Sequence, residues 1–407
     1  MEVLFVHPNF PGQFRKVAAA LAQKPGVRVV GVGDESWMKS VVPLEGVPVV
    51  PYPAPPAGAP DQLHPWVRNF DSAVRRGQQV IKTLSDHKEA GLEPDVIVTH
   101  PGWGDAYFLR DFFPGAKVVG LFEYYYHARG ADVGFDPEFP SSFDDIFRLR
   151  VLNATQLLAL DSCDEGFCPT QWQRSRFPAV WRERLGLLHD GIDTATVCPD
   201  ATAQVQLPDG TTLKAGDEVL TFVSRNLEPY RGYHIFMRAL PAILDARPDC
   251  HVVIVGAEGS AYGPPSRSGT SYRQRYLDEV ADQLDMSRVH FTGTLAHADY
   301  VRVLQVSRLH VYLTYPFILS WSMLEAMSAG CLVLGSATPP VEEVIEEGKN
   351  GLLFPFSSPR ALATRAIDAL AHPADHDGLR QAARQTIVDR YDFETVSLPA
   401  YQRMIEI

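Results

Sequence analysis

Two arginines, Arg225 and Arg231, lie close together directly after a short apolar segment, residues 218–223. Their guanidinium groups donate forked hydrogen bonds that fit phosphate oxygens. A pair of basic side chains is often only a solvated surface. Here, however, Gly232 opens a helical segment whose N-terminus adds a dipole favourable to negative charge. The position of the two arginines therefore favours binding of an anionic ligand.

A carboxylate, Glu325, lies in the otherwise apolar start of a second helical segment. This segment belongs to a strand, loop and helix spanning residues 310–330, in which Pro316 ends the strand and Gly330 closes the helix. In an α/β fold such a junction places backbone N–H groups at the carboxyl edge of a sheet. Two interpretations of Glu325 stay open: a solvated face of a core helix, or an acceptor of hydrogen bonds from ligand hydroxyl groups.

Polar residues also follow three apolar segments in the first half of the chain. His7, His100 and Glu123 come directly after the predicted strands 3–6, 95–99 and 117–122. Because the carboxyl ends of parallel strands meet at one edge of a sheet, we expect these side chains to share that edge. A lone histidine is usually structural, but His100 precedes Pro-Gly-Trp-Gly, which keeps the chain open. We therefore expect a functional role for His100.

Gly12 and three consecutive tyrosines lie in the loops at the same edge. Glycine lets the backbone approach a ligand closely, although Gly12 could equally be a simple turn residue. The loop lacks GxGxxG, so dinucleotide binding is not supported. Tyr124, Tyr125 and Tyr126 could stack on a sugar ring or cover the core, and the sequence leaves both interpretations open.

Strand and helix patterns alternate through both halves of the chain, which predicts an α/β fold with parallel sheets covered on both faces. The predicted strands are 3–6, 27–32, 95–99, 117–122, 218–223, 250–255, 289–291, 310–314, 332–334 and 351–354. The predicted helices are 15–22, 63–85, 105–112, 143–160, 233–247, 361–370 and 379–387. Residues 163–170 predict a further short strand and turn, and residues 171–177 predict the beginning of another helix. Asp209-Gly210 predicts a hairpin near the start of the second half.

Composition limits the class of protein. A chain of 407 residues exceeds one ordinary core, so two domains are expected. A net charge of -12 argues against general nucleic-acid binding. Five scattered cysteines fit a reduced cytoplasmic protein with no metal site. No apolar run could span a bilayer, and the first residues predict a strand rather than a signal peptide.

Several of these stretches together resemble a known family. Ser224–Gly232 resembles the arginine and lysine motif of glycosyltransferase family 4, Leu324–Gly330 resembles its nucleotide-sugar motif, and Asn350–Phe354 resembles the stretch that follows. The start of the chain, with His-Pro-Asn-Phe-Pro-Gly-Gln-Phe, resembles one bacterial subgroup. The resemblance implies the GT-B fold, in which two Rossmann-like domains with parallel sheets face each other across a cleft.

The resemblance also implies domain bounds and functional roles. Residues 1–190 would bind the acceptor and residues 191–385 the nucleotide-sugar, while the helix in residues 386–407 would pack on the second domain or cross back to the first. The diphosphate would be bound and stabilised by Arg225 and Arg231, although the family usually has lysine at position 231. The remaining implied contacts are Glu325 with the ribose, Gly12 near the phosphates or donor sugar, His100 beside the reacting sugar, and Gly256, Thr292 and Gly293 near the base.

Two positions depart from the family pattern. Phe317 stands where the family has the first of two glutamates. Phosphate and sugar contacts would come instead from the backbone N–H groups of Ile318, Leu319 and Ser320, or from the hydroxyls of Ser320 and Ser322. Glu123 follows a strand that often ends in histidine. Its carboxylate could accept hydrogen bonds from acceptor hydroxyls or act as a base.

These features predict a retaining, metal-independent glycosyltransferase without a cofactor. It would transfer a sugar from a UDP- or GDP-linked donor to a glycan or lipid-linked hydroxyl acceptor in bacterial polysaccharide synthesis. We expect a cytoplasmic protein that makes transient contact with the inner membrane face and binds no nucleic acid. Two alternatives stay open: a nucleotide-sugar epimerase of the same fold, which would consume donor without acceptor, and a non-catalytic nucleotide-sugar-binding protein, motivated by Phe317.

Overall fold

The computed structural model describes residues 1–38, 41–56, 62–266 and 269–406, and it divides into two compact units. Unit 1 comprises Met1–Gly134, Phe139–Gly191 and Phe393–Ile407, of which Ile407 lies outside the described residues. Unit 2 comprises Phe135–Glu138 and Ile192–Asp392. Each unit therefore contains a short segment from a distant part of the chain.

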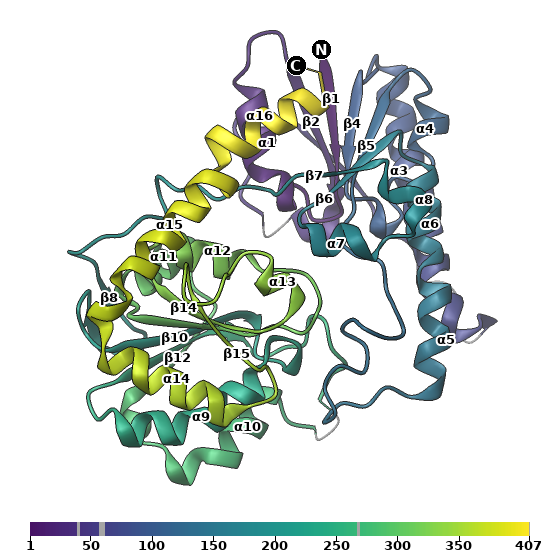
Figure 1. Cartoon of the computed structure of the whole chain (residues 1–407). Helices are drawn as coiled ribbons and strands as arrows, with labels where there is room; N and C mark the ends of the chain where they lie inside the picture. The colour runs from purple at the N-terminus through teal and green to yellow at the C-terminus, as the bar shows by residue number, and fades with distance from the viewer. Residues whose placement is uncertain (39–40, 57–61, 267–268, 407) are drawn as a thin grey trace. The chain divides into compact units, whose positions relative to one another are not determined.

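The sheet of unit 1 has the strand order β3-β2-β1-β4-β5-β6-β7, and all neighbouring strands are parallel (Figure 1). Its strands are β1 (Glu2–Val6), β2 (Arg28–Asp34), β3 (Val49–Tyr52), β4 (Val96–Thr99), β5 (Lys117–Leu121), β6 (Glu165–Cys168) and β7 (Leu185–Leu187). The chain steps from β1 outward in both directions, so the loops after β1 and β4 diverge. In open α/β sheets this switch point is where ligands bind.

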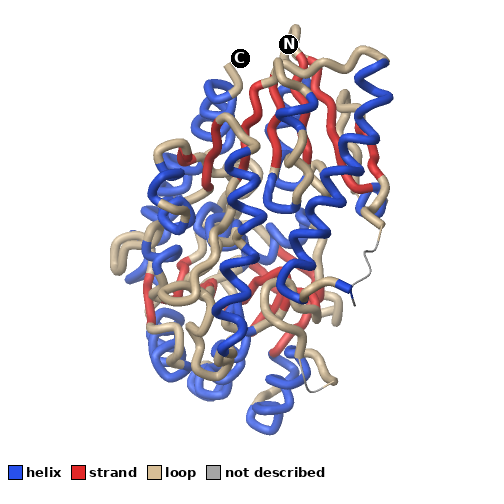
Figure 2. The backbone as a smooth tube through the Cα atoms, turned by 90° about the vertical axis from the view of Figure 1, so that its right-hand side faces the viewer, coloured by secondary structure: helices blue, strands red, loops and turns tan. Residues whose placement is uncertain are grey.

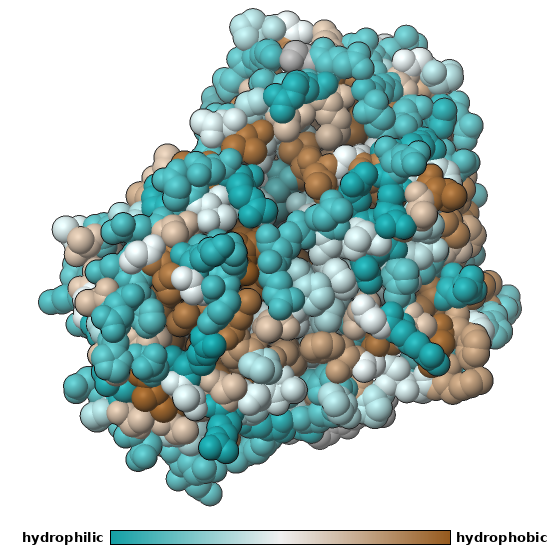
Figure 3. All heavy atoms as spheres, in the orientation of Figure 1, coloured by the Kyte–Doolittle hydropathy of each residue, from teal (hydrophilic) through white to brown (hydrophobic). Residues whose placement is uncertain are grey.

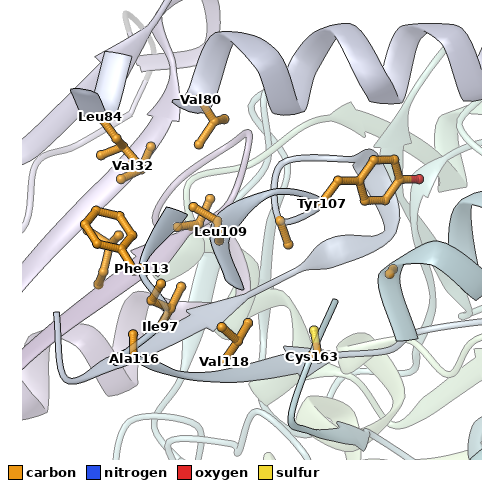
Figure 4. Close-up of a cluster of buried hydrophobic side chains, with 14 of the residues drawn as sticks. Val32, Val80, Leu84, Ile97, Tyr107, Leu109, Phe113, Ala116, Val118 and Cys163 are labelled. Carbon is orange, nitrogen blue, oxygen red and sulfur yellow. The ribbon is translucent and has the colours of Figure 1, made fainter. Parts of the chain in front are cut away.

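Successive residues of each strand in unit 1 pack on opposite faces of the sheet. Leu4 and Val6 join a core with helix α3 (Arg68–Glu89), whereas Val3 and Phe5 join a core with α1 (Arg15–Ala22). Figure 4 shows part of the first core, where Val80 and Leu84 of α3 lie above Val32, Ile97 and Val118. This continuous apolar character on both faces is what a covered parallel sheet requires.

The other helices of unit 1 include a C-terminal one. They are α2 (Glu35–Met38), α4 (Leu109–Phe112), α5 (Phe143–Leu152), α6 (Ala154–Asp161), α7 (Gln171–Arg176), α8 (Ala179–Arg182) and α16 (Leu398–Met404). Tyr401 of α16 is buried and packs edge-on against Phe167 of β6. The segment after Asp392 thus completes the face of the sheet that α1 also covers (Figure 1).

Unit 2 contains a second parallel sheet, in the order β12-β11-β10-β13-β14-β15, and a separate hairpin. The sheet strands are β10 (Val219–Asn226), β11 (His251–Ala257), β12 (Val289–Gly293), β13 (Leu309–Tyr312), β14 (Leu332–Ser336) and β15 (Leu352–Phe354). The antiparallel hairpin β8 (Gln204–Gln206) and β9 (Thr212–Lys214) turns at the predicted Asp209-Gly210. The switch point of the six-stranded sheet lies between β10 and β13.

Helices cover both faces of this second sheet, as the tube drawing shows (Figure 2). They are α9 (Tyr233–Ala246), α10 (Tyr272–Val280), α11 (His297–Val306), α12 (Trp321–Ser328), α13 (Pro339–Glu342), α14 (Pro359–Ala371) and α15 (Asp377–Tyr391). Helix α9 contacts both α10 and α14, and α12 contacts α15. The α/β class predicted from the alternating pattern is therefore confirmed.

Some predicted elements were wrong in extent. The helix predicted at 143–160 is two helices that meet at Asn153, whose side-chain amide bonds the backbone N–H and carbonyl of Tyr126. The helix predicted at 105–112 begins only at Leu109. Before it, Gly104 adopts a left-handed conformation with φ +99°. Strands β3 and β7 were missed.

Two surface observations complete the fold. Among the described residues, no helix has the length and apolarity needed to cross a bilayer. The face drawn in Figure 3 is mainly hydrophilic, in keeping with the net charge of -12.

Candidate functional site

The three strand ends of unit 1 meet as expected from the sequence. The rings of His7 and His100 lie 5.3 Å apart, edge to face, at the ends of β1 and β4. Nε2 of His100 lies 3.2 Å from Oε2 of Glu123, and the side-chain amide of Gln13 donates a 2.8 Å hydrogen bond to Oε1 of the same carboxylate. The amide of Gln173 also donates to the Glu123 carbonyl at 2.8 Å. His7, His100 and Glu123 thus form one polar cluster at the switch point of the sheet.

Burial and charge set the protonation of this cluster. Burial, together with the nearby His100, lowers the pKa of His7 from 6.5 to about 3, so its ring is neutral. Burial also acts against charge on His100, but the hydrogen bond and negative charge of Glu123 outweigh it and raise the pKa of His100. Against the effect of burial, His100 in turn lowers the pKa of Glu123. The arrangement therefore favours an imidazolium paired with a carboxylate.

Gly12 packs directly on the ring of His7. A side chain at this position would meet the imidazole at 2.7 Å, and the backbone has a left-handed φ of +46°. The backbone N–H of Asn9 donates to Nδ1 of His7 at 2.9 Å, which fixes the ring. Glycine at position 12 is consequently required for the loop to close over the histidine.

The loop that carries His100 rests on a buried carboxylate that sequence reasoning did not identify. The hydroxyl of Tyr52, at the end of β3, donates to Asp105, which is fully buried. Burial raises the pKa of Asp105 to about 6, against the hydrogen bond from Tyr52. The nearby tyrosines do not offer a free stacking surface, because Tyr124 is buried and Tyr125 packs on the core. This favours the core-covering interpretation of those two rings.

In unit 2, Arg231 is buried at the switch point of the second sheet. Its Nη1 donates to the hydroxyls of Tyr312 (3.1 Å) and Thr314 (2.8 Å) and to the carbonyl of Ile318 (3.0 Å). The guanidinium carbon lies 4.9 Å from the centre of the Tyr262 ring. Among the residues that the structure describes, no carboxylate lies within ion-pair distance of Arg231. Against the effect of burial, the negative charge of the buried Glu228 carboxylate helps to raise the pKa of Arg231 without forming a direct ion pair with it. A buried guanidinium whose direct hydrogen-bond partners are neutral can accept an anionic ligand.

The loop around Arg231 is organised by Glu228, a residue without a predicted role. Its fully buried carboxylate accepts hydrogen bonds of 3.0–3.3 Å from the backbone N–H groups of Ala261, Tyr262 and Gly263. This contact connects the loop after β10 to the loop after β11. The only sequence signal was an acidic residue placed between two arginines.

Arg225 differs from Arg231 because it is exposed. Within the described part of the chain its guanidinium makes no hydrogen bond or ion pair, so it is available to a ligand. Gly256, at the end of neighbouring β11, lies so close to the backbone of β10 that a side chain at position 256 would meet the Ser224 carbonyl at 2.6 Å. Gly293 is exposed at the end of β12. These residues follow neighbouring strands of one sheet.

The loop before α12 presents backbone groups at a helix N-terminus. The hydroxyl of Ser320 caps α12 by accepting from the Ser322 N–H. The Ser320 N–H is occupied by the Tyr312 hydroxyl at 2.8 Å. Of the three N–H groups expected to contact phosphate or sugar, those of Ile318 and Leu319 have no acceptor among the described residues. These two groups remain candidate donors to an anion.

Phe317 is 6% exposed and lies between two tyrosines. Its ring is 5.6 Å from Tyr230 and 5.3 Å from Tyr262, edge to face in both pairs. The side chain therefore supports the loop by packing against these two rings.

Glu325 lies on α12 with 12% of its side chain exposed. The Tyr300 hydroxyl donates to Oε2 at 2.9 Å, and Nε2 of His297 lies 3.1 Å from Oε1. Both partners come from α11 and had no predicted role. A carboxylate held in this way keeps free lone pairs for further hydroxyl donors.

Metal ligands are not grouped in either unit. Among the described residues, no cluster of three or more histidine, cysteine, aspartate or glutamate side chains could hold a metal ion. The five cysteines are all unpaired.

The two parallel sheets, each with polar loops at its switch point, define the GT-B class of fold. Residues 25–197 match the family model "Glycosyl transferase family 4 group", and residues 208–386 match "Glycosyl transferases group 1". The chain belongs to this family of glycosyltransferases, family 4/group 1.

Curated relatives are about a quarter identical to the chain over the residues that align. Spore coat protein SA of Bacillus subtilis is 27% identical over 237 residues, which cover 55% of this chain and 59% of the relative. Phosphatidyl-myo-inositol mannosyltransferase of Mycobacterium tuberculosis is 27% identical over 212 residues, which cover 51% and 50%. The chain therefore spans only between half and three fifths of these relatives' length.

Solved structures match over the whole chain. Sucrose-phosphate synthase from Thermosynechococcus elongatus has a TM-score of 0.73 at 19% identity, covering 100% of this chain and 98% of that one. HepE of Anabaena in complex with UDP and glucose has a TM-score of 0.67 at 18% identity, covering 100% of both chains. These similarities establish the fold.

Proposed function

We propose that this protein is a retaining glycosyltransferase that moves a sugar from a nucleoside diphosphate to a hydroxyl group. The observation that carries the proposal is Arg231, a buried guanidinium without a carboxylate partner among the described residues. It lies at the switch point of the sheet, beside the unoccupied N–H groups of the loop before α12. A diphosphate would supply oxygens that bond the guanidinium directly, whereas the Glu228 carboxylate does not bond it.

In the proposed reaction, the bond between the sugar C1 and the diphosphate oxygen breaks, and its electron pair leaves with the diphosphate. The acceptor hydroxyl oxygen forms the new bond to C1 on the same face, and its proton passes to the departing phosphate. Arg231 and Arg225 stabilise the growing charge, each contributing about 3 kcal/mol when preorganised. Glu325 accepts hydrogen bonds from the ribose, and His100 with Glu123 orients the reacting sugar or the acceptor.

The relatives indicate which substrates to test. One is named a phosphatidyl-myo-inositol mannosyltransferase and another a GDP-mannose-dependent mannosyltransferase, and HepE was crystallised with UDP and UDP-glucose. We propose a UDP- or GDP-linked donor and a glycan or lipid-linked acceptor, used on the inner side of a bacterial membrane.

A thermal-shift screen with UDP, GDP, ADP, CMP and dTDP and their sugars tests the proposal. A nucleotide at a hundred times its dissociation constant should stabilise the protein by about 2.7 kcal/mol. The stabilising donor is then incubated with hydroxyl acceptors, with and without EDTA. Transfer that persists in EDTA with retained anomeric configuration supports the proposal, whereas an epimer formed without acceptor, or binding without transfer, supports one of the two alternatives.

A further inference from the structure

Four residues that lie within the first half of the sequence belong structurally to unit 2. Phe135–Glu138, here called the acidic segment, is part of unit 2, whereas Gly134 and Phe139 on either side belong to unit 1. The segment forms no helix or strand. Its side chains are nevertheless engaged, which distinguishes it from an ordinary surface loop.

Two carboxylates and one ring attach the acidic segment to unit 2. Asp136 is 8% exposed, and its Oδ2 lies 2.9 Å from Nε2 of His234 and accepts a 2.9 Å hydrogen bond from the Tyr315 hydroxyl. Glu138 receives both Nη atoms of Arg238, at 2.6 and 3.2 Å. The ring of Phe135 lies 5.3 Å from that of Tyr315.

Tyr315 connects the acidic segment to the candidate phosphate site. Its backbone N–H donates to the Tyr230 carbonyl at 3.0 Å, and the two rings lie 4.6 Å apart. Its carbonyl accepts from the Phe317 N–H at 2.6 Å. Tyr230 immediately precedes Arg231, whose Nη1 bonds Thr314 immediately before Tyr315. Tyr315 therefore lies between the two loops that carry the proposed diphosphate contacts.

We propose that Asp136 is a positioning residue for donor binding, which acts through Tyr315 to hold the Arg231 loop and the 314–320 loop in register. The inference rests on the proposed function. Buried Asp136 remains charged because His234, Tyr315 and the Glu138 N–H all bond it. A hydroxyl held by an anion in the interior has one orientation, which restricts the loops on either side of it.

Two substitutions remove this contact from opposite sides. Asp136→Asn keeps the volume but removes the charge, and Tyr315→Phe removes only the hydroxyl. Each should raise the Kd for UDP or GDP, measured by calorimetry on the full chain, at least fivefold. Because both substitutions act on the Asp136–Tyr315 contact, the double variant should raise the Kd by less than the product of the two single effects.

Glu138→Gln is the matched control. It weakens the ion pairs with Arg238 on α9 but leaves the Asp136–Tyr315 hydrogen bond in place. Its nucleotide Kd should stay within twofold of the unsubstituted protein even if its Tm falls. In steady-state assays, Asp136→Asn should raise KM for the donor and leave KM for the acceptor unchanged.

The outcomes separate this inference from the proposed function. If the unsubstituted protein binds neither UDP nor GDP nor the other nucleotides of the screen, both proposals are overturned. If it binds a nucleotide and Asp136→Asn and Tyr315→Phe bind it equally well while their Tm falls, the acidic segment is merely structural and only this inference fails. Independent, multiplicative effects of the two substitutions would also overturn it.

Discussion

Nε2 of His100 and Oε2 of Glu123 lie 3.2 Å apart at the ends of neighbouring strands β4 and β5. The raised pKa of His100 gives stability that is complete below the ordinary value of 6.5 and is lost as the pH rises through the folded pKa. The lowered pKa of Glu123 gives stability that is present above 4.5 and is lost as the pH falls through its folded pKa. The pair therefore stabilises most between pH 4.5 and 6.5.

Glu123→Gln should consequently reduce the free energy of unfolding most near the middle of this range, by about 3 kcal/mol for a broken buried pair. Urea denaturation in mildly acidic and in alkaline buffer measures the difference. In the variant, His100 loses the hydrogen bond and charge of Glu123 that do most to offset burial, so an NMR titration should place its pKa below that of the unsubstituted protein. An equal loss of stability in both buffers would contradict the ion pair.

Arg225→Ala should reduce activity with the donor without changing the stability of the fold. The side chain is exposed and unbonded among the described residues, so the free energy of unfolding should change by less than about 0.5 kcal/mol. If Arg225 contacts the diphosphate, kcat/KM should fall on the order of a hundredfold. Arg360→Ala, which removes another exposed arginine on α14, is the control and should leave kcat/KM unchanged.

Arg231→Lys should weaken both nucleotide binding and the stability of the folded protein. Lysine keeps the charge but cannot reproduce a planar fork that reaches Tyr312, Thr314 and the Ile318 carbonyl together. We expect a nucleotide Kd at least tenfold higher and a lower Tm. Donor kinetics and thermal unfolding measure the two effects. Arg231→Met, which also removes the charge, should bind nucleotide more weakly still, and unchanged binding in that variant would exclude Arg231 from the phosphate site.

Glu325→Gln tests the predicted ribose contact. A carboxylate that accepts ribose hydroxyls contributes about 1.5–3 kcal/mol per hydrogen bond. The variant should therefore lose affinity for UDP or GDP by roughly tenfold or more but bind the 2′,3′-dideoxy analogue as the unsubstituted protein does. Tyr300→Phe, which removes one partner of Glu325, should cause a smaller change in the same direction. An equal loss of affinity for the nucleotide and for its 2′,3′-dideoxy analogue would indicate that Glu325 is only structural.

His310, in β13, should make unit 2 sensitive to acid. Burial lowers its pKa from 6.5 to about 3, so the unfolded chain binds a proton that the folded chain rejects. Stability should fall as the pH drops below 6.5, by about 1.4 kcal/mol per pH unit from this group. His310→Asn, which retains a group for the Thr221 hydroxyl, should unfold with a shallower pH dependence. Urea titrations at several pH values would show this, and an unchanged slope would contradict it.

The fold could be predicted largely from local pattern. Apolar runs such as Val3–Val6 and Leu332–Leu334 identify strands because both faces of a parallel sheet are buried. The strand Val49–Tyr52 was missed because Pro51 lies within it and disguises it as loop. The contact of the Asn153 side chain with the backbone of Tyr126, at the junction of α5 and α6, joins residues distant in sequence, and no local pattern reveals it.

Parts of the candidate site could also be predicted, for the same reason. Parallel strands deliver their ends to one edge, and this brought His7, His100 and Glu123 together. The burial of Arg231, the Glu228 contact and the attachment of Asp136 to Tyr315 were not predictable. They depend on how loops far apart in sequence fold over one another, and composition carries no signal of that.

The discontinuous make-up of unit 1 has a consequence for synthesis on the ribosome. Tyr401 and Ile405 are buried in the core that also contains Val3, Phe5 and Leu21. These two residues follow all of unit 2 in the chain, so they leave the ribosome only after unit 2 has been made. Domains usually fold in the order of their synthesis, but unit 1 must wait with one face of its sheet incomplete. A nascent chain stalled before α16 should therefore remain open to proteases in unit 1 after unit 2 has become resistant.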